Sequence, residues 1–324
     1  MLSNAKQEDF IVVMTRYSFY MDIVTELKKG KRHAIARAIS IIENNEKEAR
    51  TLIKKIFKNS GNSITIGITG PAGAGKSSLI DKTALELKKR GYKAAVLAID
   101  PTSHLTGGAI LGDRVRMSES TDSGTYIRSM ASRGATGAIS RSVRSSIRVL
   151  EYAGFDPIII ESVGAGQTEI EISKIVDVTV VVFNPNTGDN IQTIKAGLTE
   201  IGDIYLVNKS DLTGAAQLFN AVRDYIGMTE KNPSIMMTST KSNKGITEFA
   251  KKLEELMNTK KKTKSLQEKS RLEIELRDIV LNNVKSKVER MLDTSKTYEK
   301  YLKEVQAKKL DPFDAAEKIS KSIK

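Results

Sequence analysis

The stretch from Gly70 to Ser77, GPAGAGKS, constrains the fold of this chain more than any other feature of its sequence. It matches the pattern G-x-x-x-x-G-K-[ST], and it directly follows the apolar run 64–69, ITIGIT. A strand, a glycine-rich turn and a helix start, in this order, form a loop whose N–H groups converge on one anion. The pattern therefore predicts a phosphate-binding loop in an α/β fold with a mainly parallel sheet.

The chemistry of this loop assigns a role to each of its residues. Lys76 is expected to reach the β and γ phosphates of a nucleoside triphosphate, and the Ser77 hydroxyl to contact Mg²⁺. The residues that we expect to hold the phosphates are Gly70, Gly73, Ala74, Gly75, Lys76, Ser77 and Ser78.

A second motif far along the chain indicates which base is bound. The apolar run 204–207 leads into Asn208-Lys209-Ser210-Asp211, an N-K-x-D sequence. The Asp211 carboxylate can accept two hydrogen bonds from guanine, whereas adenine offers no such donor pair and would leave the carboxylate short of partners. Asn208 is expected to brace the phosphate loop and the Lys209 stem to lie along the base. Ser239 and Thr240 are expected to close over the base with backbone N–H groups.

Composition limits the other classes of site and partner that the chain could have. The chain has 324 residues, a net charge of +13 and no cysteine, so it has no disulfide or thiolate metal site and suits a reducing cytoplasm. The positive charge raises the alternatives of an RNA or a membrane partner. Lysine runs without stacking aromatics favour a solvated surface instead, so neither nucleic acid nor membrane is an expected partner. No apolar run approaches the length of a membrane span or a signal peptide.

The order of apolar patterns predicts three zones after a possible disordered extension at 1–20. Residues 21–60 are expected to be helical, 61–258 to form a nucleotide-binding domain of alternating strands and helices, and 259–324 a C-terminal helical arm. The basic run 259–264 is expected to be a linker, followed by a long helix over 265–305 and a short helix after Asp311-Pro312. The expected strands are 64–69, 94–99, 125–128, 157–161, 177–183, 203–207 and 234–237.

Acidic residues at two expected strand ends are candidate contacts for Mg²⁺. Asp100 follows the run 95–99, although it could instead cap a turn before Pro101. Glu161 follows the run 158–160 and is expected to contact the metal or its water, while the Gly164 N–H senses the γ-phosphate.

The glycine-rich stretch 106–116 is too polar for a core strand and suits a loop over the phosphates. Asp113 is a further candidate metal contact, and Arg116 is a candidate for neutralising charge in the transition state. The alternative is that the arginines of this loop only form surface salt bridges.

Together these stretches resemble the MeaB/ArgK family of P-loop GTPases, which includes the methylmalonic aciduria type A protein. The matching segments are 70–77, 97–101, 106–117, 153–156, 161–167, 187–189, 194–197 and 208–211, with further likeness at 36–40 and 311–316. The resemblance covers nearly everything from about residue 21 onward.

The resemblance implies a SIMIBI-type GTPase domain and a chaperone that uses GTP hydrolysis to gate adenosylcobalamin loading, or protection, of methylmalonyl-CoA mutase or a related acyl-CoA mutase. By the same analogy Ser77, Asp100, Asp113 and Glu161 surround Mg²⁺. Asp189 and Lys195 would lie in a switch that contacts the mutase, with Lys195 also stabilising charge. Family members are commonly homodimers built through the C-terminal arm, which suits the apolar positions from Leu272 to Leu292.

Two other functions remain open at the level of sequence. One is a GTPase that inserts nickel into hydrogenase or urease, although such proteins usually carry Cys/His sites and this chain has only His33 and His104. The other is a P-loop kinase, which needs an acceptor pocket with a base near the γ-phosphate, and no candidate base is evident in the sequence.

Overall fold

The fold is taken from a computed structural model of the chain that describes residues 22–100, 117–131, 136–162, 167–186, 200–227 and 233–322. The chain divides into two compact units, residues 1–267 and residues 268–324. The expected extension at 1–20 lies outside the described residues.

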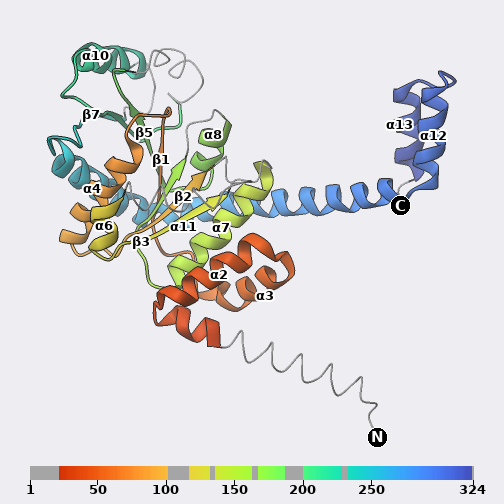
Figure 1. Cartoon of the computed structure of the whole chain (residues 1–324), viewed down its shortest axis with the longest axis horizontal. Helices are drawn as coiled ribbons and strands as arrows, with labels where there is room; N and C mark the ends of the chain where they lie inside the picture. Colours follow the sequence, from red (N-terminus) through yellow and green to blue (C-terminus); the bar gives the residue numbers. More distant parts are fainter. Residues whose placement is uncertain are drawn as a thin grey trace, which may run out of the picture. The chain divides into compact units, whose positions relative to one another are not determined.

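The first unit is built on a seven-stranded sheet with the order β3-β2-β4-β1-β5-β6-β7, in which every neighbouring pair is parallel (Figure 1). All seven strands that the sequence predicts are present, which confirms the α/β fold. The strands are β1 (Thr65–Thr69), β2 (Ala95–Asp100), β3 (Tyr126–Ala131), β4 (Ile158–Ser162), β5 (Val178–Phe183), β6 (Ile204–Val207) and β7 (Ser234–Met237).

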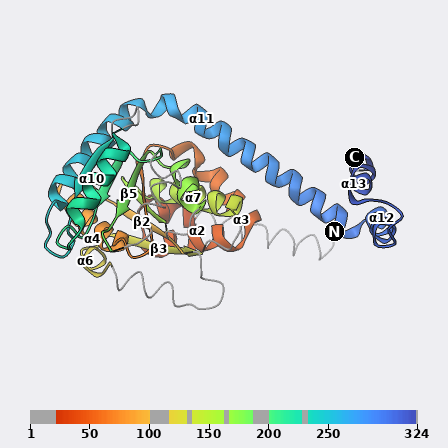
Figure 2. The same ribbon diagram turned by 90° about the horizontal axis from the view of Figure 1, so that it is seen from above.

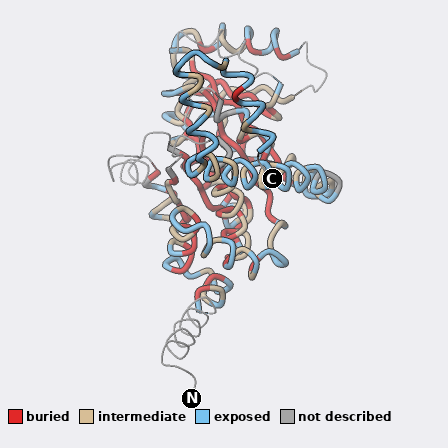
Figure 3. The backbone as a smooth tube through the Cα atoms, turned by 90° about the vertical axis from the view of Figure 1, so that its right-hand side faces the viewer, coloured by how far each residue is buried: buried red, intermediate tan, exposed pale blue. Residues whose placement is uncertain are grey.

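Both faces of the sheet are buried because alternate side chains of each strand point to opposite faces. On one face, Leu97 and Ile160 pack with the helices α2 (Arg32–Asn44), α3 (Glu46–Ile56), α7 (Thr136–Tyr152) and α8 (Gln167–Ser173), and Phe183 packs with α10 (Ala215–Ile226). On the other face, Val96 and Ile159 pack with α4 (Lys76–Lys89) and with the first part of α11 (Ile246–Thr294), while the short helix α6 (Ser118–Asp122) lies against α4. Figure 3 shows the buried strands between these helices.

One glycine of the central strand permits a close helix contact. A Cβ atom on Gly67 would lie 2.9 Å from Ile172 and 3.1 Å from Val176, both of which belong to α8 or follow it. Glycine therefore lets α8 approach β1, the strand that leads into the phosphate loop.

The N-terminal helices pack against the β3 end of the sheet, as Figures 1 and 2 show. Helix α2 (Arg32–Asn44) buries Ile35 and Ile39, and α3 (Glu46–Ile56) follows after Asn45, whose side chain accepts the Glu48 N–H. A short 3₁₀ turn, η1 (Phe57–Asn59), ends this helical region. Helices α2, α3 and η1 lie within the zone 21–60 that the sequence predicts to be helical.

The expected linker at 259–264 is wrong, because α11 runs without a break from Ile246 to Thr294. Lysine is a good helix former, and three lysines of this stretch find partners at the sheet, as described below. The long helix predicted over 265–305 is interrupted at Ser295, whose side chain accepts the Tyr298 N–H and starts α12 (Lys296–Gln306).

The second unit holds the end of α11, α12 and α13 (Pro312–Ser322), of which α12 and α13 pack together. The predicted short helix at Asp311-Pro312 is confirmed, and the Asp311 carboxylate accepts the N–H groups of Phe313 and Asp314 at its start. Among the described helices, none is both long and apolar enough to cross a membrane.

Candidate functional site

The candidate site lies at the carboxyl edge of the sheet, where the polar residues follow β1, β4, β5 and β6. The phosphate loop follows β1, which is the middle strand of the seven. Strands β4 and β5 flank β1, so the residues at their ends lie beside the loop. Ligands of open parallel sheets bind at this edge.

The backbone of the loop has the left-handed turns that its glycines allow. The φ angles of Gly70, Gly73 and Gly75 are 140°, 74° and 87°. A Cβ on Gly70 would lie 2.1 Å from the Val182 carbonyl oxygen, and one on Gly75 would lie 2.5 Å from the side-chain nitrogen of Asn208. Side chains are excluded at these two positions by both conformation and space.

Lys76 is held by its own loop. Its side chain is buried at 6% exposure, and its Nζ donates to the carbonyls of Gly70 at 2.8 Å and Pro71 at 3.0 Å. The ammonium group is therefore fixed over the mouth of the loop at the start of α4, where the helix dipole also favours an anion.

A hydrogen bond joins the loop helix to the end of β4. The Ser77 hydroxyl donates to Oε1 of Glu161 at 2.7 Å, and Glu161 is 5% exposed. One residue on, the Ser162 hydroxyl donates to Oγ1 of Thr69 at 2.7 Å. The last residues of β1 and β4 are thus tied to each other through side chains.

The N-K-x-D motif contacts the same loop. Asn208 is fully buried, and its Nδ2 donates to the Ala74 carbonyl at 3.0 Å, which is the bracing contact that the sequence predicts. Lys209 has a φ of 55°, and its Nζ donates to the Gly73 carbonyl at 2.8 Å. Thr238, after β7, donates to Oδ1 of Asn208 at 3.2 Å, which orients the amide.

Asp211 is oriented by one hydroxyl and remains accessible. The Ser239 hydroxyl donates to Oδ1 of Asp211 at 2.5 Å, and this hydrogen bond is the main cause that lowers the pKa of the carboxyl. Asp211 is therefore an ionised acceptor at neutral pH, as the contact with guanine requires. Thr240 follows Ser239 and is partly exposed.

The structure describes only some of the predicted site residues. Asp100 is the last residue of β2, next to β4 in the sheet, at the same edge as Glu161. Five predicted site residues lie outside the described part of the chain: Asp113, Arg116, Gly164, Asp189 and Lys195. Their roles stay predictions.

One contact residue was missed by the sequence analysis. Asn184 follows β5, is 1% exposed, and its Nδ2 donates to the Gly73 carbonyl at 3.2 Å. The only sequence signal is a polar residue placed directly after a fully apolar strand end, at the edge where the ligand is expected.

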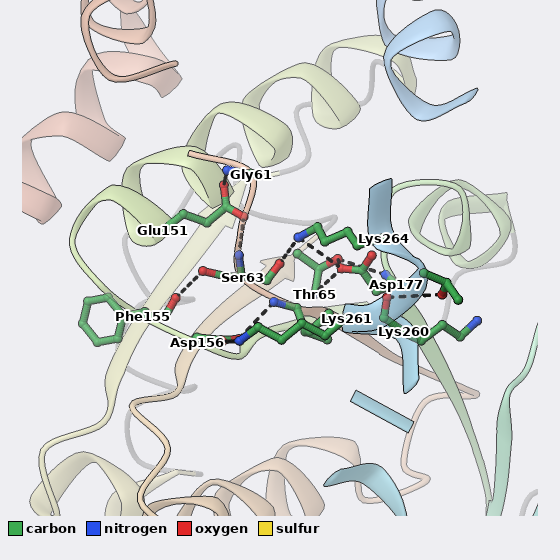
Figure 4. Close-up of polar contacts among 12 residues, drawn as sticks. Gly61, Ser63, Thr65, Glu151, Phe155, Asp156, Asp177, Lys260, Lys261 and Lys264 are labelled. Atoms are coloured by element: carbon green, nitrogen blue, oxygen red, sulfur yellow. Dashed lines mark hydrogen bonds and ion pairs between the residues drawn. The ribbon is translucent and has the colours of Figure 1, made fainter. Parts of the chain in front are cut away.

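A second polar cluster lies at the opposite, amino edge of the sheet (Figure 4). We call it the amino-edge cluster. Its acidic members are Glu151, Asp156, Asp177 and Asp203, and its basic members are Lys260, Lys261 and Lys264 of α11.

Each aspartate of the amino-edge cluster stands shortly before a strand and accepts an N–H from the strand or segment beside it. Asp156 accepts from Ile64 at 3.0 Å, Asp177 from Thr65 at 2.8 Å, and Asp203 from Thr179 at 2.8 Å. Each aspartate also forms an ion pair with a lysine of α11: Asp156 with Lys261 at 2.9 Å, Asp203 with Lys260 at 3.0 Å, and Asp177 with Lys264 at 3.9 Å.

The half-buried Glu151 of this cluster is satisfied by backbone groups. Glu151 accepts the N–H groups of Gly61 at 2.8 Å and Ser63 at 3.2 Å. Burial raises the pKa of Glu151, and the N–H groups with the nearby Lys264 charge oppose that rise. The amino-edge cluster is closed by the chain itself, which indicates a structural role.

A parallel sheet with a phosphate loop after its middle strand and an N-K-x-D motif at the same edge defines a P-loop GTPase. The family model described as methylmalonyl Co-A mutase-associated GTPase MeaB matches residues 35–293. The chain belongs to this family, and guanine nucleotide is the ligand class that the family implies.

Relatives of known name agree with this assignment. A protein of Pyrococcus abyssi, provisionally named a GTPase, is 41% identical over 312 residues, covering 93% of this chain and 96% of its own. The mouse methylmalonic aciduria type A homolog is 33% identical over 250 residues, covering 70% of this chain and 60% of its own. A crystal structure of a LAO/AO transport system kinase has a TM-score of 0.66 at 24% identity, covering 94% of this chain and 98% of that one. That structure shares the fold.

Proposed function

We propose that this protein is a GTP-hydrolysing chaperone of a cobalamin-dependent acyl-CoA mutase, with methylmalonyl-CoA mutase as the first candidate client. The family description names this mutase, and the mouse relative is named for methylmalonic aciduria. The family match extends beyond the nucleotide-binding sheet to include the N-terminal helices and nearly all of α11. A GTP-dependent role in a chain without cysteine suits the cytoplasm.

The observation that carries the proposal is the 2.7 Å hydrogen bond between Ser77 and Glu161. It connects the helix that starts at the phosphate loop to the end of β4, directly before residues 163–166. A change of ligand at Ser77 therefore reaches the segment that we expect to report the γ-phosphate through Gly164. A chaperone of this kind needs such a connection between nucleotide state and partner.

The residues at this edge fit a Mg²⁺ ion. A serine hydroxyl and a carboxylate are oxygen ligands of the kind that Mg²⁺ prefers, and Asp100 ends the neighbouring strand. We propose Ser77, Asp100, Asp113 and Glu161 as the residues that hold the ion directly or through water. When bound, Mg²⁺ would neutralise charge on the β and γ phosphates.

The chain's own residues would catalyse hydrolysis by position and charge. Water attacks the γ-phosphorus and the bond to the β–γ bridging oxygen breaks, giving GDP and phosphate. Lys76 would hold the β and γ oxygens, and Arg116 and Lys195 would stabilise developing negative charge. Asp211 would select guanine, so that the switch responds to GTP rather than ATP.

The experiment mixes the protein with the cobalamin-dependent acyl-CoA mutase of the same organism. We expect a complex in size-exclusion chromatography with a GTP analogue, faster GTP hydrolysis in the complex, and GTP-dependent transfer of adenosylcobalamin to the apo-mutase. Lys76→Ala serves as the hydrolysis-deficient control. A mutase that neither binds the protein nor changes its hydrolysis rate would contradict the proposal.

We also propose that two copies associate through the second unit. Six large apolar side chains of α11 are between 39% and 64% exposed in the single chain; they are Leu272, Ile274, Leu276, Val280, Leu281 and Val284. Surface of this kind along one helix favours a helical partner. Sedimentation is expected to give a dimer, and Leu276→Glu with Val284→Glu a monomer; a monomeric native protein would contradict this.

A further inference from the structure

Asn184 extends β5 beside the phosphate loop. In the sheet, Thr69 of β1 is aligned with Val181 of β5, so the residues after Thr69 and those after Val181 continue side by side. The backbones are in close contact there, since a Cβ on Gly70 would lie 2.1 Å from the Val182 carbonyl. Asn184 is thus placed against the loop by the sheet itself, although it belongs to neither nucleotide motif.

The two ends of the Asn184 amide have separate tasks. Oδ1 accepts the Asn186 N–H at 2.9 Å, which forms a turn after the strand. Because an N–H occupies the oxygen end, the nitrogen end faces the loop and donates to the Gly73 carbonyl at 3.2 Å. The side chain is 1% exposed, so water does not compete for these bonds.

Three side chains hold two successive carbonyls of the loop. Asn184 and Lys209 both donate to the Gly73 carbonyl, and Asn208 donates to the Ala74 carbonyl. A trans peptide points its N–H away from its carbonyl, so a fixed Gly73 carbonyl also fixes the direction of the Ala74 N–H. That N–H donates to the Pro71 carbonyl at 3.2 Å and closes a turn within the loop.

We propose that Asn184 is a positioning residue for nucleotide binding: it fixes the Gly73–Ala74 peptide, and so holds the loop in the conformation that binds the phosphates. It acts through the loop and touches no reacting atom. The inference rests on nucleotide binding at the phosphate loop, and it adds a fixed point from β5 to the known contact from Asn208. The energy involved is that of one buried hydrogen bond, so removal is expected to weaken binding about tenfold.

The test measures GDP affinity, GDP-over-IDP selectivity and the nucleotide-free unfolding midpoint for three variants. Asn184→Ala is expected to weaken GDP about tenfold, to leave the GDP-over-IDP ratio unchanged because Asp211 is untouched, and to keep kcat for GTP within a few-fold at saturation. Asn186→Ala is the matched control, since it keeps the backbone N–H that Asn184 accepts; it is expected to bind GDP as the native protein does.

The variant Asn184→Asp tests whether Asn184 acts by positioning the loop or only by forming the turn at Asn186. Aspartate keeps the acceptor for the Asn186 N–H but replaces the donor to Gly73 with an oxygen, so GDP affinity is expected to fall at least as far as in Asn184→Ala. Native affinity in Asn184→Asp, or in Asn184→Ala, would overturn the inference. If Asn184→Ala does not fold, Asn184→Asp decides alone. A native protein that binds no GDP would instead refute the GTPase assignment of the site.

Discussion

At the carboxyl edge of the sheet, Lys76 donates to two carbonyls of its own loop, whereas at the amino edge three lysines of α11 each contact an aspartate. The amino-edge aspartates also accept strand N–H groups, so both halves of each polar contact belong to the chain. At the carboxyl edge, side chains hold the carbonyls of Gly73 and Ala74, while Asp211 remains exposed.

The difference separates two uses of polar groups in one sheet. A cluster whose charges pair with one another within the chain stabilises the fold, whereas a cluster that fixes a loop backbone and keeps a carboxylate exposed at the carboxyl edge of the sheet suits a ligand. Variants at the carboxyl edge should therefore change affinity with little effect on stability, and variants at the amino edge should do the reverse.

The largest effect is expected for Lys76→Ala. Loss of the ammonium group that faces the phosphates should weaken GTP and GDP by about 1000-fold, roughly 4 kcal/mol, and abolish measurable turnover. Calorimetry and phosphate release measure this. Lys82→Ala on the same helix, whose Nζ pairs with Glu119 at 2.7 Å, is the control and should bind as the native protein does. An equal loss in both variants would argue against a special role for Lys76.

Asp177→Ala should give the largest loss of stability. It removes the acceptor of the Thr65 N–H and hydroxyl, both at 2.8 Å, at a site with 4% exposure. A free energy of unfolding lower by about 3 kcal/mol is expected from chemical denaturation, because the buried donors lose their partner. GDP affinity of the folded variant should stay within about twofold of native. If GDP affinity of Asp177→Ala fell as far as that of Lys76→Ala, the two edges of the sheet would not have separate roles in stability and in binding.

Asp211→Asn should change which base is bound. An amide presents a donor where guanine also has donors, so GDP should bind about 100-fold more weakly. Xanthosine diphosphate, which has an oxygen in place of the exocyclic amine, should bind better than to the native protein. Competition binding with both nucleotides tests this. Asp211→Ala, which offers neither pattern, should lose GDP without gaining the xanthine nucleotide.

The smallest effects are expected at the lysines of α11. Lys261 is 57% exposed and should cost at most about 0.5 kcal/mol of stability as alanine, whereas the less exposed Lys260 and Lys264 should each cost about 1 kcal/mol. Denaturant midpoints at low and high salt measure both the loss and its screening. If Lys261→Ala were the most damaging of the three changes, the structural role given to the two less exposed pairs would be contradicted.

Local patterns were sufficient to predict the sheet but not the cross-links between its strands. Near-continuous apolar runs such as 178–183 favour strands buried on both faces, and the loop at Gly70 indicates which strand is central to the site. The run 259–264 is helical, and the linker predicted there is wrong because a cluster of lysines has the same composition whether it lies in a solvated linker or on a helix. Its partners, Asp156, Asp177 and Asp203, are brought to it only by the tertiary fold.

The candidate site divides in the same way. Motif chemistry predicts roles for Lys76, Asn208 and Asp211, because each motif carries its own geometry. Asn184 and the pairing of Ser162 with Thr69 depend on strands that are neighbours in space and distant in sequence. The spacing of residues along the sequence therefore does not predict these contacts.

The anchoring of Lys76 to the carbonyls of Gly70 and Pro71 has a kinetic consequence. A free lysine side chain would give up about 2 kcal/mol of rotamer entropy on gripping a phosphate, and here most of that loss is incurred when the protein folds. Capture of GTP after each turnover then demands little rearrangement of this side chain, so the lysine itself adds little to the barrier for nucleotide association.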